Sequence, residues 1–237
     1  MRDTKVIYVL NVGGNYAPEI TALTYPLIHA YAHKIGAEWV EIKERKFPEW
    51  PVTYEKLQIH ELAKENGADW HIYFDADTLI HPQMFDVTTQ IPRDTVAHNA
   101  VDMAGQRWRY DEYFLRDGRN IGSNNWCAVA SKLCLDLWRP LDITPGEAIA
   151  NIFPTVGELN GGMGPEHLID DYALSRNIAR FGLKYTTLVD VCIKNKLAVK
   201  APTGFDCVPF FFHNYNIPEE LKISQMQEAL KNWGIMR

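Results

Sequence analysis

The chain has 237 residues, of which 46% are hydrophobic and 23% are charged, and its formal net charge is −6 at pH 7. This length and apolar content allow one sizeable domain with a buried core. The acidic balance argues against a nucleic-acid partner, because proteins that hold phosphate backbones usually carry an excess of basic residues.

Membrane-spanning and secretory segments are not indicated by the sequence. No apolar run approaches the roughly 20 residues that a transmembrane helix needs. Charged residues at positions 2, 3 and 5 stand where a secretory signal would begin its apolar stretch. We therefore expect a cytoplasmic protein without a transmembrane segment.

The first third of the chain alternates between short apolar runs and helical patterns. The continuous apolar run 6–10 is typical of a strand that is buried on both faces. The predicted elements in chain order are a strand over 6–10, a helix over 18–35, a strand over 39–42, a helix over 54–66 and a strand over 70–74. This β-α-β-α-β order predicts a parallel sheet with right-handed crossovers.

The rest of the chain is less regular. The predicted strands cover 95–101, 126–130, 186–193 and 209–212, and the predicted helices cover 165–181 and 218–233. Neither a linker nor a repeat nor a low-complexity tract interrupts the chain, so we expect a single domain over 1–237.

Two aspartates, Asp75 and Asp77, directly follow the third predicted strand. Alternate residues of a strand point the same way, so both carboxylates should face one crevice. Adjacent carboxylates repel each other unless a cation lies between them, and oxygen ligands of this kind favour Mg²⁺ or Mn²⁺. The turn over 11–14 should lie at the same edge of the sheet, where ligands of such sheets bind.

A phosphatase of the haloacid-dehalogenase type also places two aspartates after a strand. Its motif has a threonine four residues after the first aspartate, but Leu79 stands at that position and Thr78 comes one residue early. The motif of those enzymes also tends to lie on the first strand, not the third. The pattern therefore disfavours a phosphatase.

Further candidates lie later in the chain and on the second predicted helix. His213 follows a short apolar strand, where an imidazole could complete a metal site or serve as a core histidine. Asp170 and Asp171 begin a predicted helix, where the helix dipole also favours acidic residues. One of them could instead take a proton from an acceptor hydroxyl. Lys56 could reach a phosphate or remain solvated.

In order and spacing, these residues resemble glycosyltransferases of the GT-A fold. The segment 75–77 is similar to the family's D-x-D motif, and 212–214 resembles its C-terminal metal-binding histidine. The glycine-rich loop 160–163 followed by 170–182 resembles the loop and acidic-pair helix of inverting members. The resemblance implies an α/β, Rossmann-like single domain with a mixed, mostly parallel central sheet flanked by helices. It also implies a nucleotide-sugar-binding half over 1–105 and an acceptor-binding, catalytic half over 106–237.

The resemblance also implies roles for individual residues. Asp77, Asp75 and His213 would hold Mn²⁺ or Mg²⁺, with Asp75 alternatively contacting the ribose or the donor sugar. The catalytic base would be Asp171, and Asp170 and Glu166 are alternatives because the acidic pair is Asp-Asp instead of the commoner Glu-Asp. The expected donor-binding set is Asn11, Val12, Gly13, Lys56, Asp75, Ala76, Asn125, Gly161 and Gly162.

The implied function is transfer of a sugar from a nucleoside-diphosphate sugar, UDP-linked, to the hydroxyl of a glycan or another acceptor, with inversion. A retaining enzyme of the same fold is an alternative. A nucleotidyltransferase that forms sugar nucleotides would usually carry a basic glycine-rich loop after the first strand, and 12–17 contain neither Lys nor Arg. A non-catalytic sugar-binding module is a further alternative, which the intact acidic residues disfavour.

Overall fold

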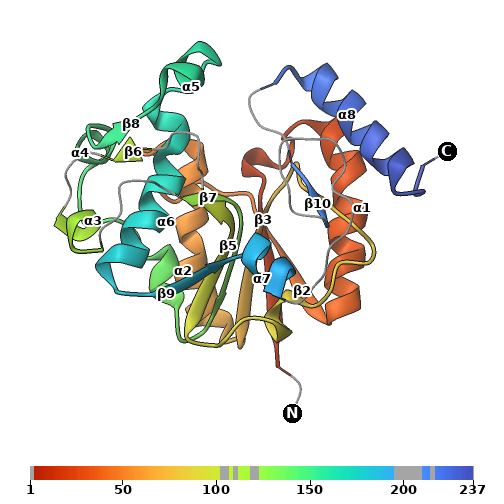
Figure 1. Cartoon of the computed structure of the whole chain (residues 1–237), viewed down its shortest axis with the longest axis horizontal. Helices are drawn as coiled ribbons and strands as arrows, with labels where there is room; N and C mark the ends of the chain where they lie inside the picture. Colours follow the sequence, from red (N-terminus) through yellow and green to blue (C-terminus); the bar gives the residue numbers. More distant parts are fainter. Residues whose placement is uncertain are drawn as a thin grey trace.

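The computed structural model describes residues 3–101, 107–108, 112–117, 123–194, 210–213 and 217–236. A six-stranded sheet in the order β2-β1-β3-β7-β5-β9 forms its centre (Figure 1). Its strands are β1 (Lys5–Leu10), β2 (Ala37–Ile42), β3 (Trp70–Asp75), β5 (Thr95–Val101), β7 (Ser123–Ser131) and β9 (Lys184–Thr187). The predicted α/β class with helices flanking a mixed central sheet is confirmed.

The first three strands are parallel to one another and adjacent in this sheet. Leu10 of β1 pairs with Ile42 of β2 on one side and with Asp75 of β3 on the other. The three strands therefore end at the same edge, as the alternation of elements predicts. The helix α1 (Pro18–Ile35) links β1 to β2 and ends at Gly36, whose φ of 69° is the left-handed conformation that glycine adopts without strain.

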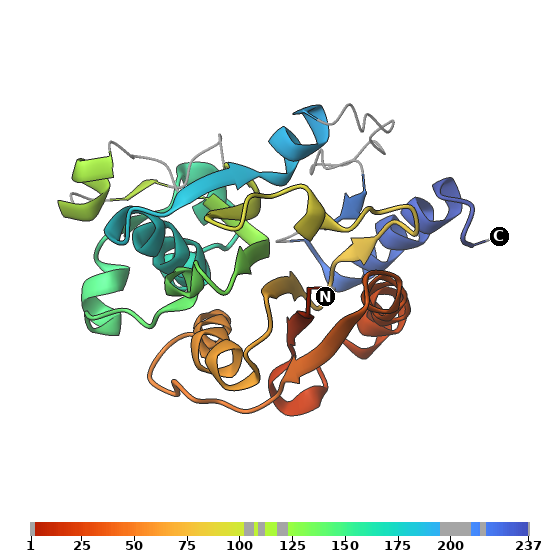
Figure 2. The ribbon, with the colours of Figure 1, turned by 90° about the horizontal axis from the view of Figure 1, so that it is seen from below.

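The sheet is mixed because β7 runs antiparallel to both β3 and β5, whereas β5 and β9 are parallel. Its two faces carry separate apolar cores. Val6 and Tyr8 of β1 pack with residues of α2 (Ile59–Asn66) and α6 (Ile169–Arg180), whereas Ile7 packs on the other face with α1. Figure 2 shows α2 and α6 on one side of the molecule and α1 on the other.

Three predicted elements differ in type from the observed ones, in part or in full. The predicted helix over 54–66 begins as a 3-10 helix, Val52–Gln58, and the one over 165–181 begins as the 3-10 helix Pro165–Leu168. The predicted strand over 186–193 is wrong: β9 ends at Thr187, and a helix, α7 (Leu188–Lys194), follows. The hydroxyl of Thr187 accepts the backbone N–H of Asp190 at 3.0 Å, which caps that helix.

The remaining elements are short or lie near the end of the chain. They are β4 (Leu79–Ile80), β6 (Arg107–Trp108), β8 (Ile152–Phe153), β10 (Phe211–Phe212), α3 (Glu112–Asp117), α4 (Pro145–Ile149), α5 (Val156–Asn160), α8 (Glu219–Asn232) and the 3-10 helices Val12–Gly14, Val87–Thr89 and Leu135–Trp138. None of the helices within the described ranges combines the length and apolar composition needed to cross a lipid bilayer.

Two contacts join the C-terminal part to the first part of the sheet. β10 pairs antiparallel with β4, which follows β3 in the chain. Met226 and Leu230 of α8 pack in an apolar cluster with Ile20 of α1. His213, which follows β10, and the start of α8 are thereby held beside the carboxyl end of β3.

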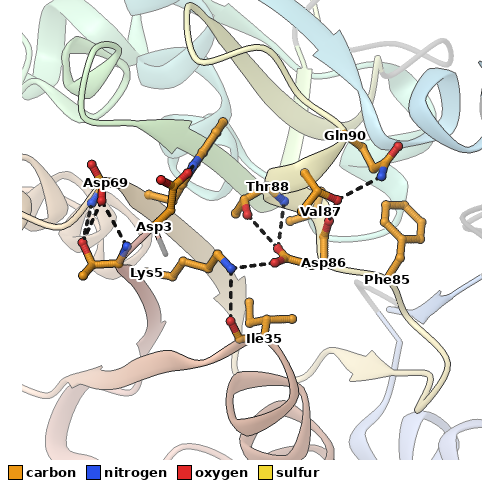
Figure 3. Close-up of polar contacts among 12 residues, drawn as sticks. Asp3, Lys5, Ile35, Asp69, Phe85, Asp86, Val87, Thr88 and Gln90 are labelled. Atoms are coloured by element: carbon orange, nitrogen blue, oxygen red, sulfur yellow. Dashed lines mark hydrogen bonds and ion pairs between the residues drawn. The ribbon is translucent and has the colours of Figure 1, made fainter. Parts of the chain in front are cut away.

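A buried lysine, Lys5, forms hydrogen bonds at the opposite, amino-terminal edge of the sheet (Figure 3). The ammonium of Lys5 donates to the carbonyl of Ile35 at 3.1 Å and to Asp86 Oδ2 at 2.6 Å. Asp86 Oδ1 accepts the backbone N–H of Thr88 at 3.2 Å. This network ties the start of β1 to the end of α1 and to the segment before Val87–Thr89.

Candidate active site

A cavity of about 380 Å³ lies at the carboxyl edge of the parallel strands. Its walls come from the ends of β1 and β3, the 3-10 helix Val52–Gln58, the segment 158–171, and the residues His213, Ile217 and Lys222. Figure 1 shows α5 and the start of α8 at this end of the molecule, opposite the amino terminus. Segments from both halves of the chain therefore meet at one cavity.

Most of the sequence-predicted site residues line this cavity. They are Asn11, Val12, Lys56, Asp75, Ala76, Asp77, Asp170, Asp171 and His213. Those that do not line it are Gly13, Asn125, Gly161, Gly162 and Glu166. Glu166 is exposed on the 3-10 helix before α6, so its carboxylate lies outside this cavity.

Asp75, Asp77 and His213 form the group that could hold a metal ion. One ligand atom from each of the three lies within 4.8 Å of the other two. His213 Nε2 is 3.5 Å from Asp75 Oδ2 and 3.2 Å from Asp77 Oδ1. The imidazole also stacks on Trp126, with ring centroids 5.2 Å apart. Two carboxylates and one imidazole suit a divalent ion that keeps positions open for other ligands.

Local structure explains why these three side chains meet. Asp75 is the last residue of β3, and the N–H of Thr78 bonds back to its carbonyl at 3.1 Å, which forms a tight turn around Asp77. The next segment, β4, pairs with β10, and His213 follows β10 directly. The pairing of two dipeptide strands thus brings residues 75 and 213 together.

Both aspartates of this group are ionised in the protein interior. Burial on its own raises the pKa of Asp77, but His213 and Lys222 outweigh burial and hold this pKa well below its usual range. Burial likewise raises the pKa of Asp75, and Lys56 and His213 outweigh it, so the net shift is downward. The two carboxylates are therefore available as charged ligands.

Lys56 is buried beneath these carboxylates. Its ammonium bonds to Asp170 Oδ2, lies 3.2 Å from Asp75 Oδ1, and lies 4.8 Å from the ring centroid of Tyr73. Burial lowers the pKa of Lys56, but Asp170 and Asp75 raise it above the usual value. The side chain is thus a buried cation that links β3 to α6.

The acidic pair at the start of α6 is held by different partners. Asp170 is bonded to Lys56, whereas Asp171 Oδ1 accepts the backbone N–H of Asn125 at 2.8 Å. Both carboxylates line the cavity and both residues are buried. Asn125 thus contributes to the site through its backbone N–H, which orients the carboxylate of Asp171.

The side chain of Asn11 is occupied within the loop after β1. Its amide donates to Glu41 Oε1 at 2.5 Å and to the hydroxyl of Tyr25 at 2.9 Å. Its side-chain oxygen accepts the backbone N–H of Tyr16 at 2.9 Å. These bonds fix the loop, so that Val12 and the wall facing the cavity keep their positions.

Sequence reasoning missed several cavity residues. Lys222, in the first turn of α8, bonds to Asp77 Oδ2, and the hydroxyl of Tyr16 donates to the same oxygen at 3.2 Å. Glu158, Met163 and His167 line the part of the wall that precedes α6. None of these residues stands in a motif, and a lysine in an amphipathic helix is usually solvated. Only the tertiary structure brings them to the site.

The chain was compared with known proteins. Its sequence matches no protein-family model and no curated protein. Its structure is similar to that of a glycosyltransferase involved in the glycosylation of the major capsid of PBCV-1, with a TM-score of 0.52 and 14% sequence identity. The similarity covers 94% of this chain and 99% of the other. At this identity the comparison shows a shared fold.

Proposed function

We propose that this protein is a metal-dependent glycosyltransferase that moves a sugar from a nucleoside-diphosphate sugar, UDP-linked, to a hydroxyl acceptor. The observation that carries this proposal is the convergence of Asp75, Asp77 and His213 in a cavity at the carboxyl edge of the parallel strands. Ligands of such sheets bind at that edge. The fold shared with a glycosyltransferase supports the same assignment.

The donor would lie between the first strand and the metal group. Asp77, Asp75 and His213 would hold Mn²⁺ or Mg²⁺, which when bound neutralises the charge of the departing diphosphate. Val12 and the backbone of residues 11–13 would approach the base and the ribose. Lys56 already bonds to Asp170 and lies beside Asp75, so we assign it to holding these carboxylates in place.

We assign the role of catalytic base to Asp171. Its carboxylate would take the proton of the acceptor hydroxyl while that oxygen forms a bond to the anomeric carbon and the bond to the diphosphate breaks, with inversion. The N–H of Asn125 holds Asp171 Oδ1 in a fixed orientation. Asp170 is instead held in a buried ion pair with Lys56, and Glu166 lies outside the cavity.

The acceptor would enter along the wall formed by the second half of the chain. Glu158, Met163 and His167 lie on this wall next to the start of α6. This mixture of a carboxylate, a thioether and an imidazole suits a polar acceptor such as a glycan, with one apolar contact. The half over 106–237 would thus supply both the acceptor contacts and the base.

A nucleotide-binding experiment tests the proposal. Thermal unfolding is measured with UDP, GDP, ADP and CDP, each with and without Mn²⁺. A nucleotide at 100 times its dissociation constant stabilises the folded state by about 2.7 kcal/mol. We expect such a shift for UDP only when Mn²⁺ is present. If none of the four stabilises the protein with Mn²⁺, the proposed function is wrong.

A product analysis tests the reaction itself. UDP-sugars are incubated with the protein, Mn²⁺ and a panel of glycan acceptors, and the anomeric configuration of any product is read by NMR. We expect a product whose configuration is opposite to that of the donor. A product with the donor's configuration would contradict inversion and the role assigned to Asp171.

A further inference from the structure

Lys222 and the metal group share one carboxylate. The ammonium of Lys222 bonds to Asp77 Oδ2, and the residue is only 7% exposed. The other oxygen of the same carboxylate, Asp77 Oδ1, lies 3.2 Å from His213 Nε2. A cation supplied by the chain therefore already occupies one side of a proposed metal ligand.

Each aspartate of the metal group lies within ion-pair distance of an ammonium group. Lys56 lies 3.2 Å from Asp75 Oδ1, and Lys222 is bonded to Asp77 Oδ2. Lys56 is also bonded to Asp170, so its charge is shared between two carboxylates, whereas Lys222 pairs with Asp77. A divalent ion that arrives alone would thus meet Asp77 already paired with Lys222 and would be repelled by both ammonium groups, at distances where the protein interior screens weakly.

The position of Lys222 is built into the fold. It lies in the first turn of α8, and the later turns of that helix are fixed by Met226, Ala229 and Leu230, which pack with Ile20 of α1. The side chain therefore reaches the cavity from an anchored helix. A solvated surface lysine, by contrast, would exchange freely between partners and would compete weakly.

We propose that Lys222 is a built-in competitor for the metal. It neutralises Asp77 when metal is absent, keeps the affinity for a free divalent ion low, and makes tight metal binding depend on the negative charge that a diphosphate brings. This inference rests on the proposed metal-dependent function. The first turn of α8 would thus control when the metal binds.

Two consequences follow for binding. Removal of the Lys222 ammonium should strengthen the binding of the metal in the absence of nucleotide. If Lys222 made only a structural contact, its removal would weaken metal binding or leave it unchanged. In a variant without this ammonium, metal binding and nucleotide binding should also depend less on each other. Part of their coupling comes from the repulsion between Lys222 and the metal, which the diphosphate offsets. Since coupling is reciprocal, this loss is measurable from either ligand.

The first experiment measures Mn²⁺ binding without nucleotide, by the electron paramagnetic resonance signal of free Mn²⁺. It compares the wild-type protein with Lys222→Met, Lys222→Gln and the control Lys231→Met, which removes an exposed lysine from the last turn of the same helix. We expect both Lys222 variants to bind Mn²⁺ at least about ten-fold more tightly, since one unit charge near a metal is removed. The control should match the wild type.

Asp77→Asn in the Lys222→Met background locates the effect. We expect it to abolish the gain, because the gained ion would bind at Asp77. Unchanged or weaker Mn²⁺ binding by Lys222→Met and Lys222→Gln, with circular dichroism spectra like that of the wild type, would overturn the proposal. So would a gain that survives Asp77→Asn.

A parallel titration with UDP distinguishes this proposal from the proposed function. If wild-type protein binds UDP only with Mn²⁺ but the Lys222 variants gain no affinity for Mn²⁺ alone, only the competitor role is wrong. If no variant binds Mn²⁺, either alone or with UDP, the metal site is wrong and both proposals fail. Lys222→Met should also lower the ratio of UDP affinities measured with and without Mn²⁺.

Discussion

The ammonium of Lys56 is bonded to the carboxylate of Asp170, which joins the 3-10 helix Val52–Gln58 to the first turn of α6 inside the protein. Both side chains are almost fully buried. A buried ion pair contributes little net stability relative to apolar residues of the same size, but the loss of one partner leaves a charge without compensation. The two residues therefore constrain the cavity wall as a unit.

Lys56→Met should destabilise the protein by about 3–5 kcal/mol, because it leaves Asp170 buried without its cation. The free energy of unfolding is measured by urea denaturation, with Lys64→Met, an exposed lysine of α2, as the control. The double variant Lys56→Met/Asp170→Leu should recover part of the loss, since no charge is stranded. A loss below about 1 kcal/mol for Lys56→Met would contradict the burial of this pair.

Asp171→Asn should lower the rate of sugar transfer by about 10²–10⁴-fold, because the amide cannot accept the acceptor's proton. The affinity for the donor with Mn²⁺ should not change. Glu166→Gln is the control and should keep the wild-type rate, since Glu166 is exposed outside the cavity. Near-normal turnover by Asp171→Asn would remove Asp171 from the role of base.

Asp77→Asn should abolish the stabilisation by UDP that depends on Mn²⁺, because an amide is a poor ligand for a divalent ion in place of a carboxylate. His213→Ala should weaken it, since one of three ligand atoms is lost. Thermal unfolding with and without Mn²⁺ measures both effects. Glu228→Gln, an exposed acidic residue of α8, should behave like the wild type. An unchanged response of Asp77→Asn would place the metal elsewhere.

The parallel part of the fold could be predicted from the sequence because local and tertiary signals agree there. The apolar run over β1 and the glycines after α1 and α2 mark the elements, and the β-α-β-α-β order places Asp75 and Asp77 at the ligand edge. The placement of Asp170 and Asp171 came instead from the resemblance to GT-A glycosyltransferases, because this alternation of elements does not reach α6. No long-range contact is needed for these predictions.

The errors arise where a short apolar run has no clear period. The run 188–193 contains β-branched residues and resembles a strand, but it forms α7. Thr187 followed by Asp190 is a capping pattern that indicates a helix start: the Thr187 hydroxyl accepts the N–H of Asp190 and donates to its carboxylate. That signal was available in the sequence.

The partners of the site could not be predicted in this way. Lys56 and Lys222 stand in helical segments with no motif, and a lysine there is usually solvated. Their burial follows from contacts across 114 and 145 residues of the chain. Sequence patterns report local period and spacing, so they allowed Lys56 at the site but did not indicate its ion pair with Asp170 or the approach of Lys222.

The stability of the protein should fall between about pH 6.5 and pH 4 because of His71, a fully buried residue of β3. Burial lowers the pKa of His71 from 6.5 to about 4. The Tyr8 hydroxyl lies 3.2 Å from Nδ1, and Nε2 lies 3.1 Å from the carbonyl of Ala68, which fits a neutral ring that accepts the first bond and donates the second. The unfolded chain binds a proton in this pH range and the folded protein does not, so full stability is present above pH 6.5 and about 3 kcal/mol is lost as the pH falls to 4.

The variant His71→Asn removes the titrating ring. It should lose less stability across this range than the wild type when the two proteins are unfolded by urea at each pH. Buried and paired carboxylates also titrate at low pH, but they do so in both proteins, and equal slopes would therefore show that His71 is not the group responsible.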